Sequence, residues 1–209
     1  MVKIKKVISG VLAVNCYLIY CDETKKTLIV DPGEDGDKII AEIEKENLQP
    51  EMLVNTHGHF DHIMSDGQIR KRFNIPLAVS KDDASMISSS FYNGSDAFFG
   101  EEISIETPEI LLYDNQTVEL SFTKFKVIHT PGHSEGGICL LFDGFIITGD
   151  TLFAGTIGRT DFPNGDHEKM LASLAKLKKL NPQTVVYPGH GSITTIANEL
   201  RHNPYLRQI

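Results

Sequence analysis

Residues 56–62, with the sequence THGHFDH, place three histidines and an aspartate directly after the apolar residues 52–54. A short apolar run is typical of a buried strand. Packing gives no reason for four polar side chains at the end of such a strand, whereas imidazole and carboxylate groups are the usual ligands of zinc, iron and manganese. This stretch therefore predicts a fold in which a buried strand ends at a metal site.

Other predicted strands end in residues of the same chemical types. His133 lies in HTPGHSEGG and His190 in YPGHGS, each after a Pro-Gly turn, and Asp150 closes the run FIITGD. Sites in α/β folds are built from the loops beyond strand ends, so these residues can converge. Two metal ions about 3.5–4 Å apart need more ligands than residues 56–62 supply. The three later residues can supply them, and Asp150 can bridge both ions with separate oxygens.

The apolar pattern alternates strands and helices in two loosely similar halves. Periodicity predicts helices from about residue 37, over 61–73 and over 167–180. Strands are predicted at 4–8, 12–20, 27–30, 52–55, 76–79, 125–129, 138–142, 145–148 and 184–187. Two sheets packed face to face, with helices outside, would accommodate this order.

Composition narrows the classes of partner and location. The 209 residues are 41% hydrophobic, and the formal net charge of −8 argues against binding to nucleic acid or to anionic membranes. No apolar run approaches the roughly 20 residues that span a bilayer. The three cysteines are scattered and suggest neither a disulfide framework nor a metal motif. We therefore expect a cytoplasmic protein with no nucleic-acid partner and no membrane partner.

The motifs THGHFDH, HTPGHSEGG, GDTLF and PGHG resemble, in this order, the metal-binding elements of the metallo-β-lactamase fold superfamily. GRTDFPNGDH and the ending LRHNPYL resemble its glyoxalase II-like branch, in particular short bacterial hydroxyacylglutathione-hydrolase-like members. The resemblance covers essentially the whole chain. It implies an α/β (α+β, four-layer) fold, the αββα metallo-β-lactamase-fold sandwich, with residues 1–209 as a single hydrolase domain.

The resemblance also implies a role for each motif residue. The first metal ion would be bound by His57, His59 and His133, the second by Asp61, His62 and His190, and Asp150 would bridge the two. Catalytic roles are implied for Asp61 and Asp150, and two divalent ions are expected, with zinc favoured over iron or manganese. Asp31, in the turn DPG, is either a partner of the ligand loop or a plain turn residue.

The implied chemistry is hydrolysis. A metal-bound water has its pKa lowered to about 7, so hydroxide is available at neutral pH to attack an acyl carbon. We expect a thioesterase, monomeric or homodimeric, that cleaves a small-molecule acyl thioester of the hydroxyacylglutathione type. The chain ends soon after the last implied ligand, without the C-terminal region that binds glutathione in glyoxalase II, which leaves glutathione specificity open. A mononuclear-iron persulfide dioxygenase-like oxidoreductase and a non-catalytic metal-binding interaction module are the alternatives.

A long polar segment, residues 88–108, is turn-rich yet aromatic. Such a segment is either a surface excursion or a lid over a site. Under the second interpretation the opposite wall of the site is formed by Phe91, Tyr92, Phe98 and Phe99.

Arg159, in GTIGRTDFP, follows the expected bridging residue and should lie near the metal edge. Its guanidinium either pairs with Asp161 and shapes the loop, or holds a substrate carboxylate through its forked donors. Arg159, Phe98 and Phe99 are therefore the predicted substrate contacts.

Overall fold

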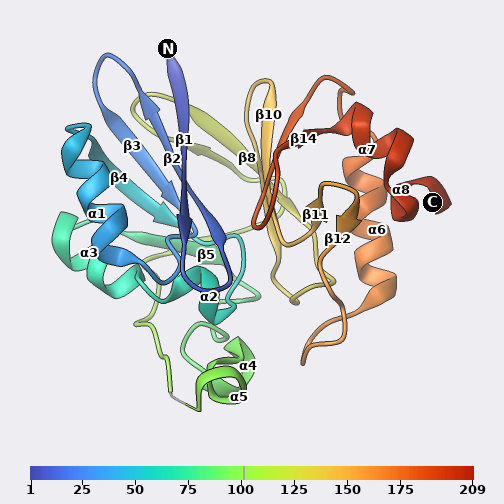
Figure 1. Cartoon of the computed structure of the whole chain (residues 1–209), viewed down its shortest axis with the longest axis horizontal. Coiled ribbons are helices and arrows are strands. Elements are labelled where there is room, and N and C mark those ends of the chain that lie inside the picture. The colour runs from blue at the N-terminus through green and yellow to red at the C-terminus, as the bar shows by residue number, and fades with distance from the viewer. Residues whose placement is uncertain (101) are drawn as a thin grey trace.

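Two sheets packed face to face form the centre of the computed structural model, and helices cover the outer side of each sheet (Figure 1). The structure describes residues 1–100 and 102–209, without the side chain of Phe99. The predicted substrate contact through Phe99 therefore lies outside the described residues. Over this range the layers are those of the predicted αββα sandwich, and the expected α/β fold class is confirmed. No helix in the described part combines the length and the apolar character needed to cross a membrane.

The first sheet has helices α1 (Gly36–Lys45) and α3 (Asp66–Phe73) on its outer side, and α2 (Phe60–Ile63) follows its fourth strand. Its strands lie in the spatial order β1 (Val2–Ser9), β2 (Val14–Cys21), β3 (Lys26–Val30), β4 (Gln49–Val54), β5 (Leu77–Ser80) and β6 (Ile110–Leu112). Two short helices, α4 (Ser90–Asn93) and α5 (Ser95–Phe99), lie between β5 and β6 in the chain.

The second sheet has helices α6 (His167–Leu177), α7 (Ile196–His202) and α8 (Pro204–Gln208) on its outer side. Its strands lie in the order β14 (Thr194–Thr195), β13 (Val185–Pro188), β10 (Phe145–Gly149), β9 (Ile138–Leu141), β8 (Lys124–His129) and β7 (Thr117–Glu119). A small hairpin pairs β11 (Leu152–Phe153) with β12 (Thr156–Ile157).

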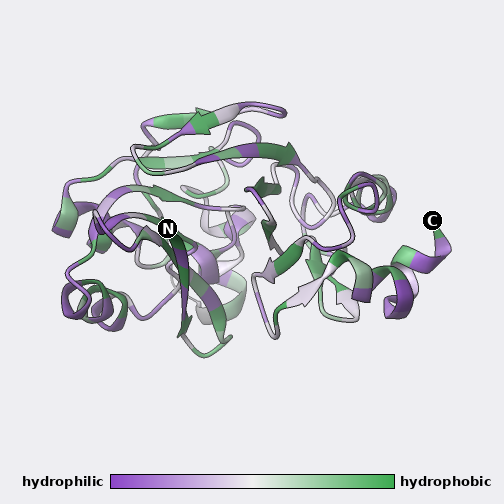
Figure 2. Cartoon of the chain, turned by 90° about the horizontal axis from the view of Figure 1, so that it is seen from above, coloured by the Kyte–Doolittle hydropathy of each residue, from purple (hydrophilic) through white to green (hydrophobic). Residues whose placement is uncertain are grey.

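Alternate residues of β2 show how one strand contributes to two apolar layers. Cys16 and Leu18 pack with Ile39 of α1, whereas Tyr17 and Ile19 belong to the layer between the sheets. Side chains of a strand alternate between its two faces, so a strand buried on both faces is apolar throughout. Figure 2 shows hydrophobic stretches along the strands and mixed colours along the helices. A third layer, on the other side of the second sheet, contains Met170, Leu174 and Leu177 of α6.

The strand directions bring several carboxyl ends to one edge. Both β8 and β10 pair antiparallel with β9, so they run the same way, and β13 is parallel to β10. Backbone hydrogen bonds join the two sheets nearby, from Ile138 N to Thr56 O (2.9 Å) and from Asn15 N to Gly189 O (2.7 Å). The residues that follow β4, β8, β10 and β13 consequently meet between the sheets.

Two predicted segments differ from the structure. The helix predicted over 61–73 is interrupted between α2 and α3, where Ser65 N donates to Gly33 O at 2.7 Å and ties the chain to the turn after β3. Residues 88–108, predicted as a long loop, contain α4 and α5, which are separated by Gly94 with a left-handed φ of +84°. Within the described residues, five strands have no predicted counterpart; β6 and β14, of three and two residues, are examples too short to give a periodic signal.

Two glycines provide a matched test of the packing. A Cβ on Gly132, whose φ is +139°, would lie 2.5 Å from Met170 N and Cα, whereas one on Gly67 in α3 would have no heavy atom of the described residues within 4 Å. We expect Gly132→Ala to lower the free energy of unfolding by about 1–3 kcal/mol, because the two backbones must separate. Gly67→Ala should raise it by about 0.4–1 kcal/mol, because alanine restricts the unfolded chain. Urea unfolding followed by circular dichroism measures both, and equal effects would contradict this account.

Candidate metal centre

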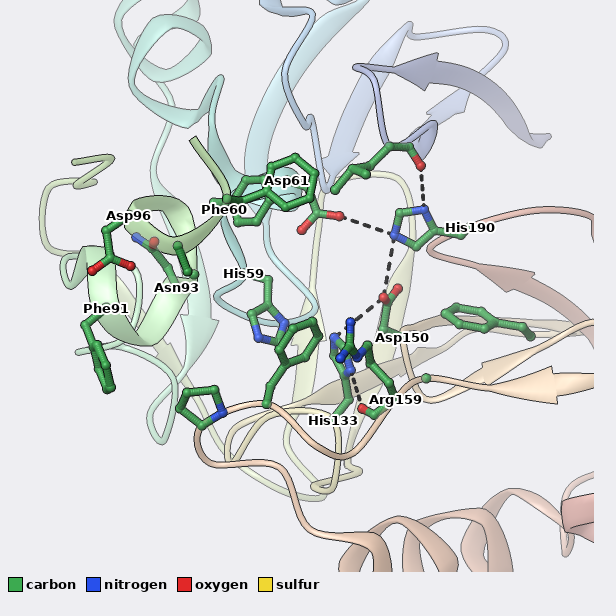
Figure 3. Close-up of a pocket in the computed structure, with 18 residues that line it drawn as sticks. His59, Phe60, Asp61, Phe91, Asn93, Asp96, His133, Asp150, Arg159 and His190 are labelled. Atoms are coloured by element: carbon green, nitrogen blue, oxygen red, sulfur yellow. Dashed lines mark hydrogen bonds and ion pairs between the residues drawn. The ribbon is translucent and has the colours of Figure 1, made fainter. Parts of the chain in front are cut away.

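The seven residues predicted as metal ligands lie together at the edge between the two sheets. Figure 3 shows those that also line the neighbouring cavity, which are His59, Asp61, His133, Asp150 and His190. They come from the segment after β4 and from the residues after β8, β10 and β13: His57, His59, Asp61, His62, His133, Asp150 and His190. Three overlapping groups have one ligand atom of each member within 4.8 Å of the others: His57, His59 and His133; His57, His62 and Asp150; and Asp61, His62 and His190. The structure thus assembles the predicted set, while its binding of metal stays a prediction.

The backbone after β4 explains how one short segment supplies four of these side chains. His59 is extended, with φ −69° and ψ 145°, and it is the residue that precedes α2. In extended backbone, residues two apart point to the same side, and the rings of His57 and His59 have centroids 4.9 Å apart. The chain then turns into α2, which carries Asp61 and His62. The change from strand to helix therefore directs both pairs toward one point.

Asp150 occupies the middle of the cluster. Its Oδ1 lies 3.5 Å from His62 Nε2, and its Oδ2 lies 3.5 Å from both His133 Nε2 and His190 Nε2. Asp61 Oδ2 lies 3.3 Å from His190 Nε2 on the other side. One carboxylate therefore faces histidines of all three groups, which is the position that a bridging ligand requires.

The donor set fits a divalent cation. Among the described residues, the buried atoms His57 Nε2, His59 Nδ1 and Asp150 Oδ1 have no hydrogen-bond partner. A buried polar atom without a partner costs about 1–3 kcal/mol. Imidazole nitrogens and carboxylate oxygens that converge in this way are the ligands that zinc, iron and manganese accept.

Two of the histidines are oriented by backbone carbonyl groups. His133 Nδ1 lies 2.8 Å from Arg159 O, and His190 Nδ1 lies 3.0 Å from Leu12 O. Because a carbonyl oxygen only accepts, each Nδ1 must carry the proton and donate it. The lone pair of each ring is then on Nε2, which faces the cluster, as a metal ligand requires.

Asp31 holds the ligand segment from behind. This buried residue has a left-handed φ of 50°, and its Oδ1 accepts from Thr56 N at 2.8 Å. Its Oδ2 accepts from Thr56 Oγ1 at 2.7 Å and lies 3.1 Å from His62 Nδ1. Asp31 is thus both a turn residue and a partner of the ligand segment, the two interpretations that its sequence position left open.

The charges of the cluster favour a cation. Burial lowers the pKa of His57 well below its ordinary value, and the neighbouring imidazoles lower it further. Burial also opposes the charged form of His62, but the carboxylates of Asp61 and Asp150 outweigh it and raise the pKa of His62 to about 10. The pKa of Asp61 lies below its ordinary value because, although burial raises it, the neighbouring imidazoles lower it more. The carboxylates therefore impose a negative potential on this point.

Asp83 is a functional candidate that the sequence analysis missed. Its buried carboxylate accepts from Gly58 N at 3.0 Å, Ser134 Oγ at 2.7 Å and Gly136 N at 2.6 Å. Gly58 stands between two predicted ligands and Ser134 follows a third, so one side chain ties the two segments together. A carboxylate shortly after the predicted strand 76–79 was the signal that could have identified it.

A cavity of about 560 Å³ opens beside the cluster. Phe91 and Phe98 form part of its wall, whereas Tyr92 does not line it. Arg159 also lines the cavity, and its Nε and Nη2 donate to Asp161 Oδ1 and Oδ2 at 2.7 and 2.9 Å. The guanidinium of Arg159 thus lies at the cavity and is also paired with Asp161. Its role in substrate binding stays a prediction.

Comparisons place this geometry among known proteins. The family profile described as Metallo-beta-lactamase superfamily matches residues 9–190. "Hydroxyacylglutathione hydrolase GloC" of Haemophilus influenzae is 36% identical over 201 residues, covering 92% of this chain and 92% of the relative.

Solved structures of similar fold carry different names. BLEG-1 B3 metallo-beta-lactamase has a TM-score of 0.94 and 36% identity, covering 98% of this chain and 99% of that one. ETHE1 from Myxococcus xanthus has a TM-score of 0.80 and 28% identity, covering 97% and 83%. TTHA1623 in a di-iron-bound form has a TM-score of 0.84 and 31% identity, covering 97% and 100%.

Asp83→Asn tests whether the missed carboxylate positions the predicted ligands. The three groups that surround Asp83 all donate to it, so an amide nitrogen would face a donor and loosen both segments. We expect the affinity for zinc to fall by about 10–100-fold, as measured by competition with a chromophoric chelator. Asp82→Asn, an exposed neighbour, is the control and should leave the affinity unchanged. Equal zinc affinity in the two variants would show that Asp83 serves packing alone.

Proposed function

The chain belongs to the metallo-beta-lactamase superfamily, and from this premise we propose that it is a glyoxalase II-like hydrolase that cleaves an acyl thioester. Membership supports a metal-dependent hydrolase with a small-molecule substrate. The thioester is supported by the similarity to GloC, a hydroxyacylglutathione hydrolase. We also propose that residues 1–209 act as a single hydrolase domain.

We propose that the cluster holds two divalent metal ions, with zinc favoured. One ion would be held by His57, His59 and His133, the other by Asp61, His62 and His190, and both by Asp150. The observation that carries the proposal is the set of buried ligand atoms without hydrogen-bond partners beside a cavity. The di-iron form of TTHA1623 supports iron as the alternative metal.

The proposed roles of the side chains follow from their positions. When bound, divalent ions supply Lewis acidity at this point and lower the pKa of coordinated water. Asp61 lines the cavity with its carboxylate 14% exposed, so it can accept a hydrogen bond from the attacking water and orient it. The Nδ1 contacts of His133 and His190 keep both rings fixed during the reaction. Aromatic walls hold the acyl thioester and exclude other water.

A mononuclear-iron persulfide dioxygenase-like activity is the second candidate. The similarity to ETHE1 from Myxococcus xanthus supports it, over 97% of this chain and 83% of that one. A non-catalytic interaction module is less well supported, because the predicted ligand set is complete and borders a cavity.

Metal replacement separates the two activities. Protein stripped with a chelator should lose activity, and zinc should restore hydrolysis of acyl thioesters without oxygen uptake, tested with a hydroxyacylglutathione thioester and with the acetyl thioester of benzyl mercaptan. Reconstitution with zinc, iron(II) and manganese in parallel, assayed for thiol release and for oxygen consumption with a persulfide, provides the comparison. Oxygen uptake with iron alone, and no thiol release with any metal, would contradict the hydrolase activity and support the dioxygenase activity.

Asp150→Ala tests the shared ligand. Removing this carboxylate takes a ligand from both proposed ions, so we expect at least one ion to be lost and hydrolysis to fall by at least about 100-fold. Metal content by mass spectrometry and steady-state kinetics measure the two effects. The control is Asp143→Ala, an exposed aspartate in the turn between β9 and β10. Two retained ions with normal turnover would mean that Asp150 is misassigned.

A further inference from the structure

The cavity beside the cluster has aromatic walls, and some of these side chains are largely exposed to solvent. Phe91 and Phe98 are 60% and 54% exposed although both line the cavity. Phe98 packs near Phe60, with ring centroids 5.1 Å apart. Phe162 also lines the cavity, and its ring lies 4.9 Å from the ring of His59. Binding sites for apolar groups have such walls, which become covered when the ligand enters.

Apart from the predicted metal ligands, the side chains that line the cavity offer little charge to hold an anion. Of the described residues that line it, Arg159 is the only arginine or lysine. Its Nε and Nη2 donate to Asp161, and its Cζ lies 4.2 Å from the centroid of Phe162. Asp96 lines the same cavity and has an exposed carboxylate. The charged side chains of this part of the cavity are therefore one cation, which is paired with Asp161, and one anion.

The Arg159–Asp161 ion pair affects the charge that the cavity presents to a substrate more than it affects the stability of the protein. Both side chains are more than half exposed, so water screens the pair and it contributes little to stability. A substrate carboxylate could reach the guanidinium, but it would have to share it with Asp161 and lie close to that like charge. Asp161 thus reduces the attraction of Arg159 for an anion without closing the cavity.

We propose that this site takes thioesters whose thiol portion is apolar and carries no carboxylate, and that Asp161 contributes to this preference by neutralising Arg159. The inference rests on the proposed thioesterase function and names its substrate class. In the reaction, water forms the new C–O bond to the acyl carbon and the C–S bond breaks. The products are a carboxylic acid and the free thiol. Glutathione, with two carboxylates, is then a poor thiol portion.

Two acetyl thioesters test the preference, because they share the acyl group and differ in the thiol. We expect metal-loaded protein to hydrolyse the acetyl thioester of benzyl mercaptan with a kcat/KM above that for S-acetylglutathione. Asp161→Asn should raise the ratio of kcat/KM for the glutathione ester to that for the benzyl ester by about threefold to fivefold, through KM. Asp143→Asn, remote from Arg159 in sequence and exposed, should leave the ratio unchanged. A wild-type preference for the glutathione ester, or an unchanged ratio in Asp161→Asn, would overturn the inference.

Thiol binding distinguishes failure of the inference from failure of the proposed function. Calorimetric titration of metal-loaded protein with benzyl mercaptan and with glutathione needs no turnover. Tighter binding of benzyl mercaptan is expected, and tighter binding of glutathione would overturn the inference. If the titration favours benzyl mercaptan but neither ester is hydrolysed, the thioesterase activity fails, and with it the substrate class named here.

Discussion

The Asp150 carboxylate faces three imidazole nitrogens, and the surrounding structure is arranged to hold that contact. Its two oxygens lie 3.5 Å from the nearest nitrogens of His62, His133 and His190, which come from three separate chain segments. Buried ligand atoms around it lack hydrogen-bond partners, and each costs about 1–3 kcal/mol. A protein that keeps such a cluster must hold it by other contacts, and a bound cation offsets the cost. Stability and metal affinity are therefore expected to be coupled.

Those other contacts come from both sheets. Asp31 hydrogen-bonds the backbone and hydroxyl of Thr56 and reaches His62, while Asp83 joins the segments that contain Gly58 and Ser134. Carbonyl groups of the neighbouring segments orient two more histidines. Because each partner lies on a different segment, the geometry of the cluster depends on the docking of the two sheets and on the apolar layer between them.

We expect substrate specificity to depend on the walls of the cavity and not on the cluster of predicted ligands. Proteins with names as different as lactamase, ETHE1 and hydroxyacylglutathione hydrolase are similar to this chain over most of its length. The cluster and the fold therefore do not by themselves choose a substrate. We propose that the choice rests with the walls of the cavity, to which α4, α5 and the residues after β12 contribute. Phe98 and Arg159 lie on these walls. Substitution of either side chain would alter the charge or the shape of the cavity and would leave the seven predicted ligands unchanged.

The sequence by itself determined the layers and the membership of the cluster. The apolar strands specify two buried sheets, and packing gives no reason for the four polar side chains of residues 56–62 at the end of one strand, so both could be predicted from local pattern. Tertiary structure decided what depends on partners distant in the chain. The break between α2 and α3 arises from a hydrogen bond to Gly33, and the role of Asp83 arises from donors 25 to 53 residues away. The pairing of Arg159 and the position of Phe98 near Phe60 were likewise set by how segments pack, because no local pattern encodes which side chains meet across the sheets.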